Sequence, residues 1–292
     1  MKTKSGSILI IMAGICWGMI GLFSSRLADA GCSAVEITFL RSLVTAVCLW
    51  AYLAVCGRDK LKIRWKDLWM FLGTGMLSIV LFNICYFITI ELTTLSVAAI
   101  LLYTAPCFVL LLSVLLFGEK LTVKKAAALV IAMAGCVCTT GLLDGGGAGH
   151  ISLFGILTGI GSGIGYALYT IFGNVALKKY DTMTVTAYTF LVASVSLLPF
   201  CGLDVLPVLM QGGNVIGNTL AIGMISTLAP FLLYTKGLKT TEPGRASVMA
   251  FVEPMVATLI SVLILHEPMS VMGVIGVVAI FGSIVLLNVG KK

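Results

Sequence analysis

Two ionisable side chains, Glu253 and Arg41, stand well inside long apolar stretches of this sequence. At 1.5 Å per helical residue, each lies about 12 Å from one end of its stretch, near the middle of a bilayer core about 30 Å thick. A charge at this depth costs roughly 2.5–3.5 kcal/mol on insertion scales and normally faces a cavity or a partner. We therefore expect Glu253 to bind a proton or a substrate amine, and Arg41 to be its countercharge or a carboxylate anchor. Alternatively, the two charges, or Arg41 and a backbone carbonyl, only brace the helices.

Glu253 precedes a proline in residues 246–268, ASVMAFVEPMVATLISVLILHEP, and this stretch repeats residues 98–120, AAILLYTAPCFVLLLSVLLFGEK. A shift of 148 residues superimposes the two without a gap, and Glu253 then stands where the first copy has Ala105. Each proline removes a helix hydrogen bond, which deprives the carbonyls of Leu102 and Ala250 of their usual donors. Pro106 and Pro254 are therefore candidate hinges, and a static kink at each is the alternative.

Further polar side chains with apolar bodies occur inside the same kind of stretch. Buried Tyr and Trp need a hydrogen-bond partner, which a cavity can supply. Contact with lipid or with the membrane interface is the alternative, and it is strongest for Tyr169 and Tyr234. The candidates for lining a substrate cavity are Trp17, Asn83, Tyr86, Tyr103, Tyr166 and Tyr234.

The composition identifies the kind of molecule that holds these side chains. Of the 292 residues, 59% are hydrophobic and only 11% are charged, whereas a soluble domain has roughly 25% charged residues. The chain is therefore a membrane protein, and its first apolar stretch is a retained span rather than a signal peptide. At about 20 residues per span we predict ten helices, at residues 6–25, 33–55, 68–89, 95–116, 124–142, 152–176, 183–201, 216–235, 246–265 and 270–289.

The distribution of basic residues predicts the orientation. Lys and Arg concentrate in cytoplasmic connections of polytopic proteins. If both termini are cytoplasmic, all of the 19 basic residues except Arg26 and Arg41 fall in inner segments. The net charge of +7 is thus explained by orientation and does not indicate nucleic-acid binding.

The repeat has inverted topology. Residues 86–123 match 234–271 at ten of 38 positions, and each half contains five predicted helices. Because five is odd, the second half must enter the membrane from the opposite side. The basic residues accordingly lie at opposite ends of equivalent spans in the two halves. We predict a first repeat at 1–143, a linker at 144–150 and an inverted second repeat at 151–292. Inverted repeats are typical of secondary transporters, whose site lies near the midplane between the halves.

Several motifs recur in both halves. They are YFITIEL and YTKGLK before the proline helices, TAP…FGEK and VEP…LHEP along them, and GICWG and GIGYA in the first helix of each half. With the five-plus-five repeat, they make the chain resemble the ten-helix branch of the drug/metabolite transporter superfamily, with two EamA-type domains. The resemblance implies a carrier of small metabolites, often an exporter of amino acids or related solutes, with a central cavity lined by both halves. It implies no particular substrate.

Other patterns argue against other chemistries. GILTGIGSGIGYA at 155–167 lies in an apolar span, so its glycines at every fourth position indicate close helix packing rather than a nucleotide loop. No span or loop carries a nucleophile–base set, an ATP motif or a metal-ligand cluster, and His150 and His266 make no metal site. We expect no catalytic residue, metal or cofactor. Cys32 and Cys201 could form a disulfide if both lie near the outer face, and Glu119 and Glu267 are expected to act in loops or caps.

We therefore expect a secondary transporter, in the cell membrane, that exports small organic solutes such as amino acids by alternating access. Protons are a possible coupling ion, and the protein is a monomer or a homodimer. A lipid flippase or a multidrug efflux carrier on the same fold is the alternative, and a membrane-embedded enzyme is disfavoured.

Overall fold

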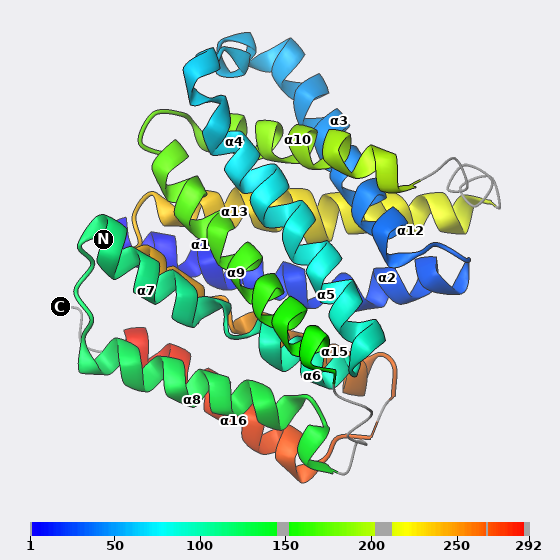
Figure 1. Cartoon of the computed structure of the whole chain (residues 1–292), viewed down its shortest axis with the longest axis vertical. Coiled ribbons are helices and arrows are strands. Elements are labelled where there is room, and N and C mark those ends of the chain that lie inside the picture. Colours follow the sequence, from blue (N-terminus) through cyan, green and yellow to red (C-terminus); the bar gives the residue numbers. More distant parts are fainter. Residues whose placement is uncertain (1, 145–151, 202–211, 267, 289–292) are drawn as a thin grey trace.

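The computed structural model describes residues 2–144, 152–201, 212–266 and 268–288. All regular structure in these ranges is helical, which confirms the predicted all-α membrane fold (Figure 1). The first half contains α1 (Lys2–Gly18), α2 (Ile20–Asp29), α3 (Ala34–Cys56), α4 (Leu68–Thr74), α5 (Leu81–Leu92), α6 (Leu95–Leu102), α7 (Ala105–Phe117) and α8 (Val123–Thr139). The second contains α9 (Leu153–Ala176), α10 (Thr182–Cys201), α12 (Gly213–Gly223), α13 (Ala229–Leu238), α14 (Pro243–Met249), α15 (Val252–Leu263) and α16 (Val271–Asn288).

Within the described ranges, nine helical stretches are long and apolar enough to cross a membrane. Several of them consist of two helices in line, such as α1 with α2 and α6 with α7. The predicted span at 124–142 corresponds to α8, which is helical over 17 residues. Part of the predicted linker, residues 145–150, lies outside the described residues, as do His150 and Glu267.

Side-chain caps explain where several of these helices begin. Ser33 accepts a hydrogen bond from Glu36 N, and the Glu36 carboxylate accepts one from Ser33 N at 2.6 Å, which makes a capping box at the start of α3. Thr94 and Thr122 cap α6 and α8 in the simpler way. Helix α7 ends at Gly118, whose φ of 65° is a conformation that glycine adopts without a steric penalty.

The two halves break their spans at equivalent positions. A π-helical segment, Gly75–Val80, joins α4 to α5, and another, Met224–Leu228, joins α12 to α13. The proline helices are also both divided, between α6 and α7 and between α14 and α15. The proline helices are divided close to Pro106 and Pro254, where the sequence predicted a hinge or a kink. The π-helical segments were not predicted, because hydropathy reports the length of a span and not its internal hydrogen bonding.

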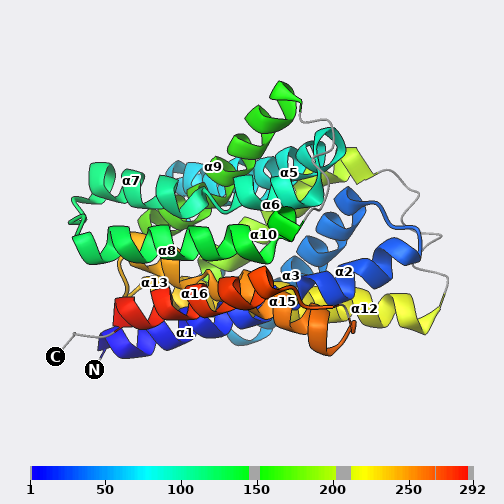
Figure 2. The same ribbon diagram turned by 90° about the horizontal axis from the view of Figure 1, so that it is seen from below.

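The packing of the two halves is equivalent as well. Helix α1 packs on α13 while α9, its repeat equivalent, packs on α5. At the start of α1, Gly6 lies against Thr240 and Thr241, and at the start of α9 the equivalent Gly155 lies against Leu92 and Thr93. Helices α3 and α10 pack together, as do α8 and α16, which lie side by side in Figures 1 and 2.

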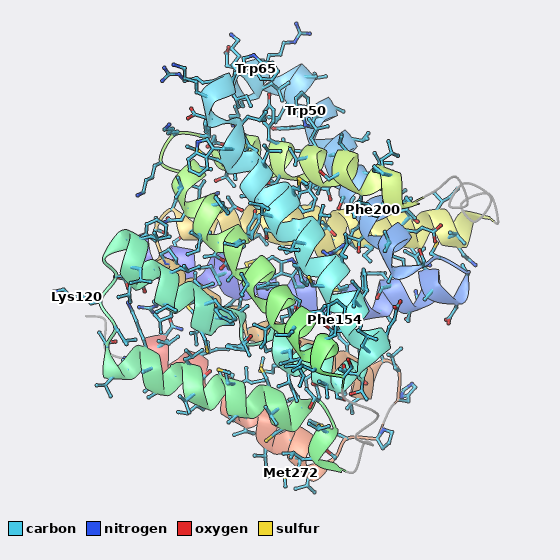
Figure 3. The ribbon with its side chains drawn as sticks, in the orientation of Figure 1. Trp50, Trp65, Lys120, Phe154, Phe200 and Met272 are labelled. Carbon is cyan, nitrogen blue, oxygen red and sulfur yellow. The ribbon has the colours of Figure 1, made fainter. Side chains whose placement is uncertain are left out.

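We name the two ends of the helix bundle for the orientation that the basic residues predict. The inner end carries the start of α1 and the connections at 57–67, 118–122, 177–181 and 239–242. The outer end carries the connections at 30–33 and 93–94. Figure 3 shows Lys120 at the inner end and Phe154, in the first turn of α9, away from it.

The glycines of α9 pack closely against the first proline helix, as their spacing predicted. A Cβ at Gly159 would lie 2.3 Å from Leu101 Cδ1, and one at Gly163 would lie 3.0 Å from Leu101 O and 2.7 Å from Thr104 Oγ1. Cys32 and Cys201 do not form the disulfide that the sequence suggested. Both are free cysteines with buried side chains.

Gly163→Ala should destabilise the fold, because the added methyl group meets a backbone carbonyl that cannot move independently. We expect a loss of about 1–3 kcal/mol, seen as a lower midpoint of thermal unfolding in detergent. Gly173→Ala on the same helix is the matched control, because a Cβ at that position has no neighbour within 4 Å. Equal midpoints for the two variants would contradict this account of the α9 packing.

Candidate functional site

A cavity of about 500 Å³ lies between the two halves. Its wall comes from α1, α2, α3, α5 and α6 of the first half and from α9, α12, α13 and α15 of the second. Gly21, Ser25, Ala28 and Leu95 line it and are exposed, and all four lie toward the outer end. The exposed part of the cavity lining therefore lies toward the outer end.

Most of the predicted site residues meet in this cavity. Trp17, Arg41, Asn83, Tyr86, Tyr103, Tyr166 and Glu253 all line it. Tyr234 does not, and instead lies beneath it beside a smaller pocket of about 30 Å³, which Trp17 and Tyr166 also line. Residues from six spans are thus brought together, although they are spread over most of the sequence.

Arg41 is held in place by an amide side chain. It is 7% exposed, and its Nη2 donates to Asn83 Oδ1 at 3.2 Å. Thr38, one turn earlier on α3, also donates to Asn83 Oδ1, at 3.3 Å. Asn83 Nδ2 donates in turn to Ile79 O at 2.6 Å. Because Ile79 lies in the π-helical segment Gly75–Val80, this irregular stretch helps to orient the amide that holds the guanidinium.

Glu253 lies at the start of α15, on the other side of the cavity. Tyr166 Oη donates to its Oε2 at 3.3 Å. The backbone N–H of Glu253 donates to Ala250 O at 2.9 Å. Pro254 has no N–H to serve as the usual donor to this carbonyl, and the tighter turn between α14 and α15 lets Glu253 donate instead. Pro106 and Pro254 line a small pocket of about 20 Å³ together with Tyr103, Tyr166 and Glu253.

Arg41, which is buried, and Glu253, which is partly buried, share one cavity but have different partners. No ion pair joins Arg41 to Glu253, and neither of the bracing contacts that the sequence suggested for Arg41 occurs among the described residues. The guanidinium is held by Asn83 and the carboxyl group by Tyr166. A positive and a negative group are thus both presented to whatever fills the cavity.

Aromatic side chains form the floor of the cavity, on the side of the inner end. The Trp17 ring packs edge-on against Phe231 with 5.2 Å between centroids and lies the same distance from the Tyr234 ring. Tyr234 Oη is 2.8 Å from Thr170 Oγ1, and Tyr169 Oη is 2.7 Å from Thr235 Oγ1. The alternative that Tyr169 and Tyr234 contact lipid is wrong, since both side chains are buried and hydrogen-bonded.

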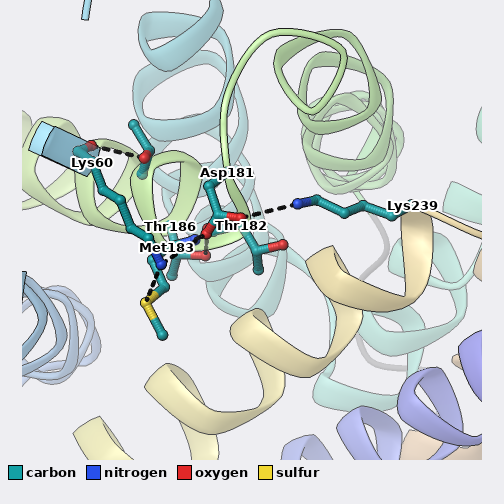
Figure 4. Close-up of polar contacts among 7 residues, drawn as sticks. Lys60, Asp181, Thr182, Met183, Thr186 and Lys239 are labelled. Atoms are coloured by element: carbon teal, nitrogen blue, oxygen red, sulfur yellow. Dashed lines mark hydrogen bonds and ion pairs between the residues drawn. The ribbon is translucent and has the colours of Figure 1, made fainter. Parts of the chain in front are cut away.

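Below the floor, ion pairs close the inner end. Asp181 pairs with Lys239 at 3.1 Å and with Lys60 at 3.7 Å (Figure 4). Burial alone would raise the pKa of the Asp181 carboxyl, but the hydrogen bond from Met183 N and the charges of Lys239 and Lys60 lower it below its usual value. Since a lowered pKa keeps the carboxylate ionised until the pH falls through it, these pairs persist at neutral pH. Asp67 likewise pairs with Lys179 at 2.6 Å.

Sequence reasoning missed some of the side chains that complete the site. Thr38 lies three residues before Arg41, so helical spacing could have placed it on the same face. Phe82, Phe87 and Phe231 line the cavity, and nothing distinguishes them in the sequence from other apolar residues. The described residues contain no cluster of His, Cys, Asp and Glu side chains suited to a metal ion.

Comparison with protein families places the whole fold in a known group. The model of the EamA-like transporter family matches the chain twice, at residues 4–141 and 153–289. These matches cover both halves and leave out only the two ends and a short segment around the predicted linker.

Similar proteins carry transporter names. Two proteins of Archaeoglobus fulgidus are each named an uncharacterized transporter. The first is 29% identical over 84% of this chain and 84% of its own length. The second is 28% identical over 97% of this chain and 96% of its own length. YicL of Salmonella typhimurium, named an uncharacterized inner membrane transporter, is 22% identical over 100% of this chain and 97% of its own. One solved crystal structure superposes with a TM-score of 0.81 at 20% identity, over 97% of this chain and 96% of the other. At this identity the likeness shows the fold.

Proposed function

We propose that this chain, which belongs to the EamA-like transporter family and is thus a multi-pass transporter of the cell membrane, is a secondary exporter. It works by alternating access. Its substrates are small organic solutes such as amino acids. One observation carries this proposal. Arg41 and Glu253 line a single cavity of about 500 Å³ and are not paired with each other.

The geometry supports a solute with both an ammonium and a carboxylate group. A guanidinium binds a carboxylate with two parallel hydrogen bonds, and a carboxylate accepts hydrogen bonds from an ammonium group. The volume is typical of small-molecule pockets, which are mostly apolar with a few placed polar groups. Trp17, Tyr86 and Tyr103 supply apolar wall with polar edges, which fits the carbon skeleton of such a solute.

Proton coupling follows from the position of Glu253. In the open cavity, a single carboxyl group can hold either a proton or the ammonium group of a solute. If the two compete, a proton moving inward can drive a solute outward. Pro106 and Pro254 are the proposed hinges, because each stands just inside the second part of a divided helix.

The proposed topology has ten spans as a five-plus-five inverted repeat with both termini in the cytoplasm. Helix α8, fifth in the order of the chain, is added to the nine longer stretches to give ten spans. Its 17 residues are at the lower limit for crossing a bilayer. The proposed units are 1–143 and 151–292, joined by 144–150. The equivalent packing of Gly6 and Gly155 on the opposite half supports the inversion.

Two alternative functions use the same cavity. A lipid flippase would need a lateral opening to the bilayer, and a multidrug carrier would accept amphiphilic cations through Glu253 and the aromatic wall alone. Arg41, which has no carboxylate partner in the cavity, favours a solute with an anionic group over an amphiphilic cation. Catalysis is not part of the proposal, and the protein acts as a monomer or a homodimer.

Glu253→Gln should reduce pH-driven flux to the level of empty vesicles, because the amide keeps the shape of the side chain and cannot carry a proton. The measurement uses proteoliposomes with an imposed pH gradient and a panel of amino acids, amphiphilic cations and labelled lipids. Glu91→Gln is the matched control, since Glu91 is an exposed carboxyl at the outer end of α5. Undiminished flux in the Glu253→Gln variant would overturn the proton-coupled mechanism, and flux of lipid alone would favour the flippase.

Arg41→Met should separate solutes by their chemistry. Loss of a buried charged hydrogen bond to a carboxylate costs about 2 kcal/mol or more, so the half-saturating concentration of amino acids should rise about 30-fold or more. Amines that lack a carboxylate should be affected far less. Arg26→Met, at an exposed position in α2, serves as the control. An equal effect on both kinds of solute would argue against Arg41 as the carboxylate anchor.

A further inference from the structure

The two proline helices of the repeat touch at one end of the molecule and are separated at the other. At the inner end, α7 of the first half packs on α14 of the second. The repeat-equivalent pair at the outer end is α6 with α15, and these helices line the cavity through Leu95 and Leu102 on one and Glu253 and Ala257 on the other. We call the α7–α14 contact the inner seam.

A group of charges, two of them buried and the third, Glu242, exposed, fastens the inner seam. Lys125 Nζ donates to Glu119 Oε1 at 2.7 Å, to Glu242 Oε2 at 2.8 Å and to Lys120 O at 3.0 Å. All three donors of the ammonium group are thereby used. The side chains of Lys125 and Glu119 are only 10% and 3% exposed. Because Glu242 belongs to the second half, the lysine joins the two halves.

Glu119 also crosses the seam on its own. Its Oε2 accepts a hydrogen bond from the backbone N–H of Gly244, in the first turn of α14, at 3.0 Å. The approach is close, since a Cβ at Gly244 would lie 2.8 Å from Glu119 Oε1 and 2.6 Å from Leu110 Cδ1. The absence of a side chain at Gly244 therefore permits this contact.

Only one of these three charges has a charged equivalent in the repeat, since Glu119 corresponds to Glu267. At the offset of 148 residues, Lys125 corresponds to Gly273 and Glu242 corresponds to Thr94. If α6 and α15 came into contact at the outer end as α7 and α14 do at the inner end, that contact would lack both the lysine and the second carboxylate. The lysine-centred ion pairs of the inner seam therefore have no counterpart at the repeat-equivalent positions of the outer end.

We propose that Glu119, Lys125, Glu242 and Gly244 form a latch that holds the carrier open to the outside and must break each time it opens to the cytoplasm. The proposal rests on alternating access as its premise. A second ion pair at the inner end, between Asp181 and Lys239, joins the start of α10 to the end of α13 (Figure 4). The asymmetry of the latch biases a symmetric scaffold toward one of its two states.

Hydrogen exchange of the full-length protein in nanodiscs, without solute, tests the latch. Glu119→Gln removes the charge that faces Lys125, and Gly244→Ala displaces the carboxylate without changing any charge. In both variants the amides at 244–251 should exchange on the order of tenfold faster, because the inner seam opens more often. Amides at 20–28 and 95–102, on the walls of the cavity, should exchange more slowly, because the outer end is closed for more of the time.

The opposite changes at the two ends distinguish a latch from a contact that only stabilises the fold. Faster exchange at both ends, or at the inner seam alone, would overturn the proposal. Asp59→Asn is the matched control, since it breaks an exposed ion pair with Lys62 on the same face and should change neither end. The readout needs no transport, so failure of the latch and failure of the proposed proton-coupled flux are separate results.

Discussion

The hydrocarbon core of a bilayer offers neither hydrogen bonds nor countercharges, so each polar group placed there must be satisfied by protein or must face a cavity. This constraint explains the organisation of the molecule. Arg41 is held by Asn83, and Asn83 is oriented by a carbonyl of a π-helical segment. Glu253 stands where a divided helix begins again, and Tyr166, from α9 of the same half, donates a hydrogen bond to it. Irregular backbone occurs in these spans where it positions the buried charges or divides a helix beside the cavity.

The scaffold is a repeat, while the chemistry placed on it is not. The halves share divided proline helices, π-helical segments and a common packing pattern, yet Glu253 has Ala105 as its counterpart and Lys125 has Gly273. A fully symmetric molecule would have two states of equal free energy and two equal half-sites. In the mechanism that we propose, one carboxyl group near the midplane and one set of ion pairs at the inner end give it a preferred state and a directional cycle.

Much of this could be read from the sequence, because charges in apolar stretches and a shift of 148 residues are local signals. They placed Glu253, Arg41 and most of the aromatic wall in one cavity. The contacts that complete the site depend on which helices meet, and a single sequence does not report that. Asn83 was recognisable as a polar residue in a span but not as the partner of Arg41. Tyr234 was expected in the cavity but lies beneath it, beside a smaller pocket, since hydropathy does not reveal depth. Glu119 was expected in a loop or cap, and its bond to Gly244 connects residues 125 positions apart.

The central claim is that Glu253 exchanges a proton for the ammonium group of a solute, and proton release on binding measures this most directly. A pH indicator in weakly buffered detergent solution, read across a series of pH values while a transported amino acid is added, reports the protons released per solute bound. The account predicts release of about one proton from the wild type, within a limited pH range, and none from Glu253→Gln. Saturable binding to the wild type with no proton release at any pH would contradict it.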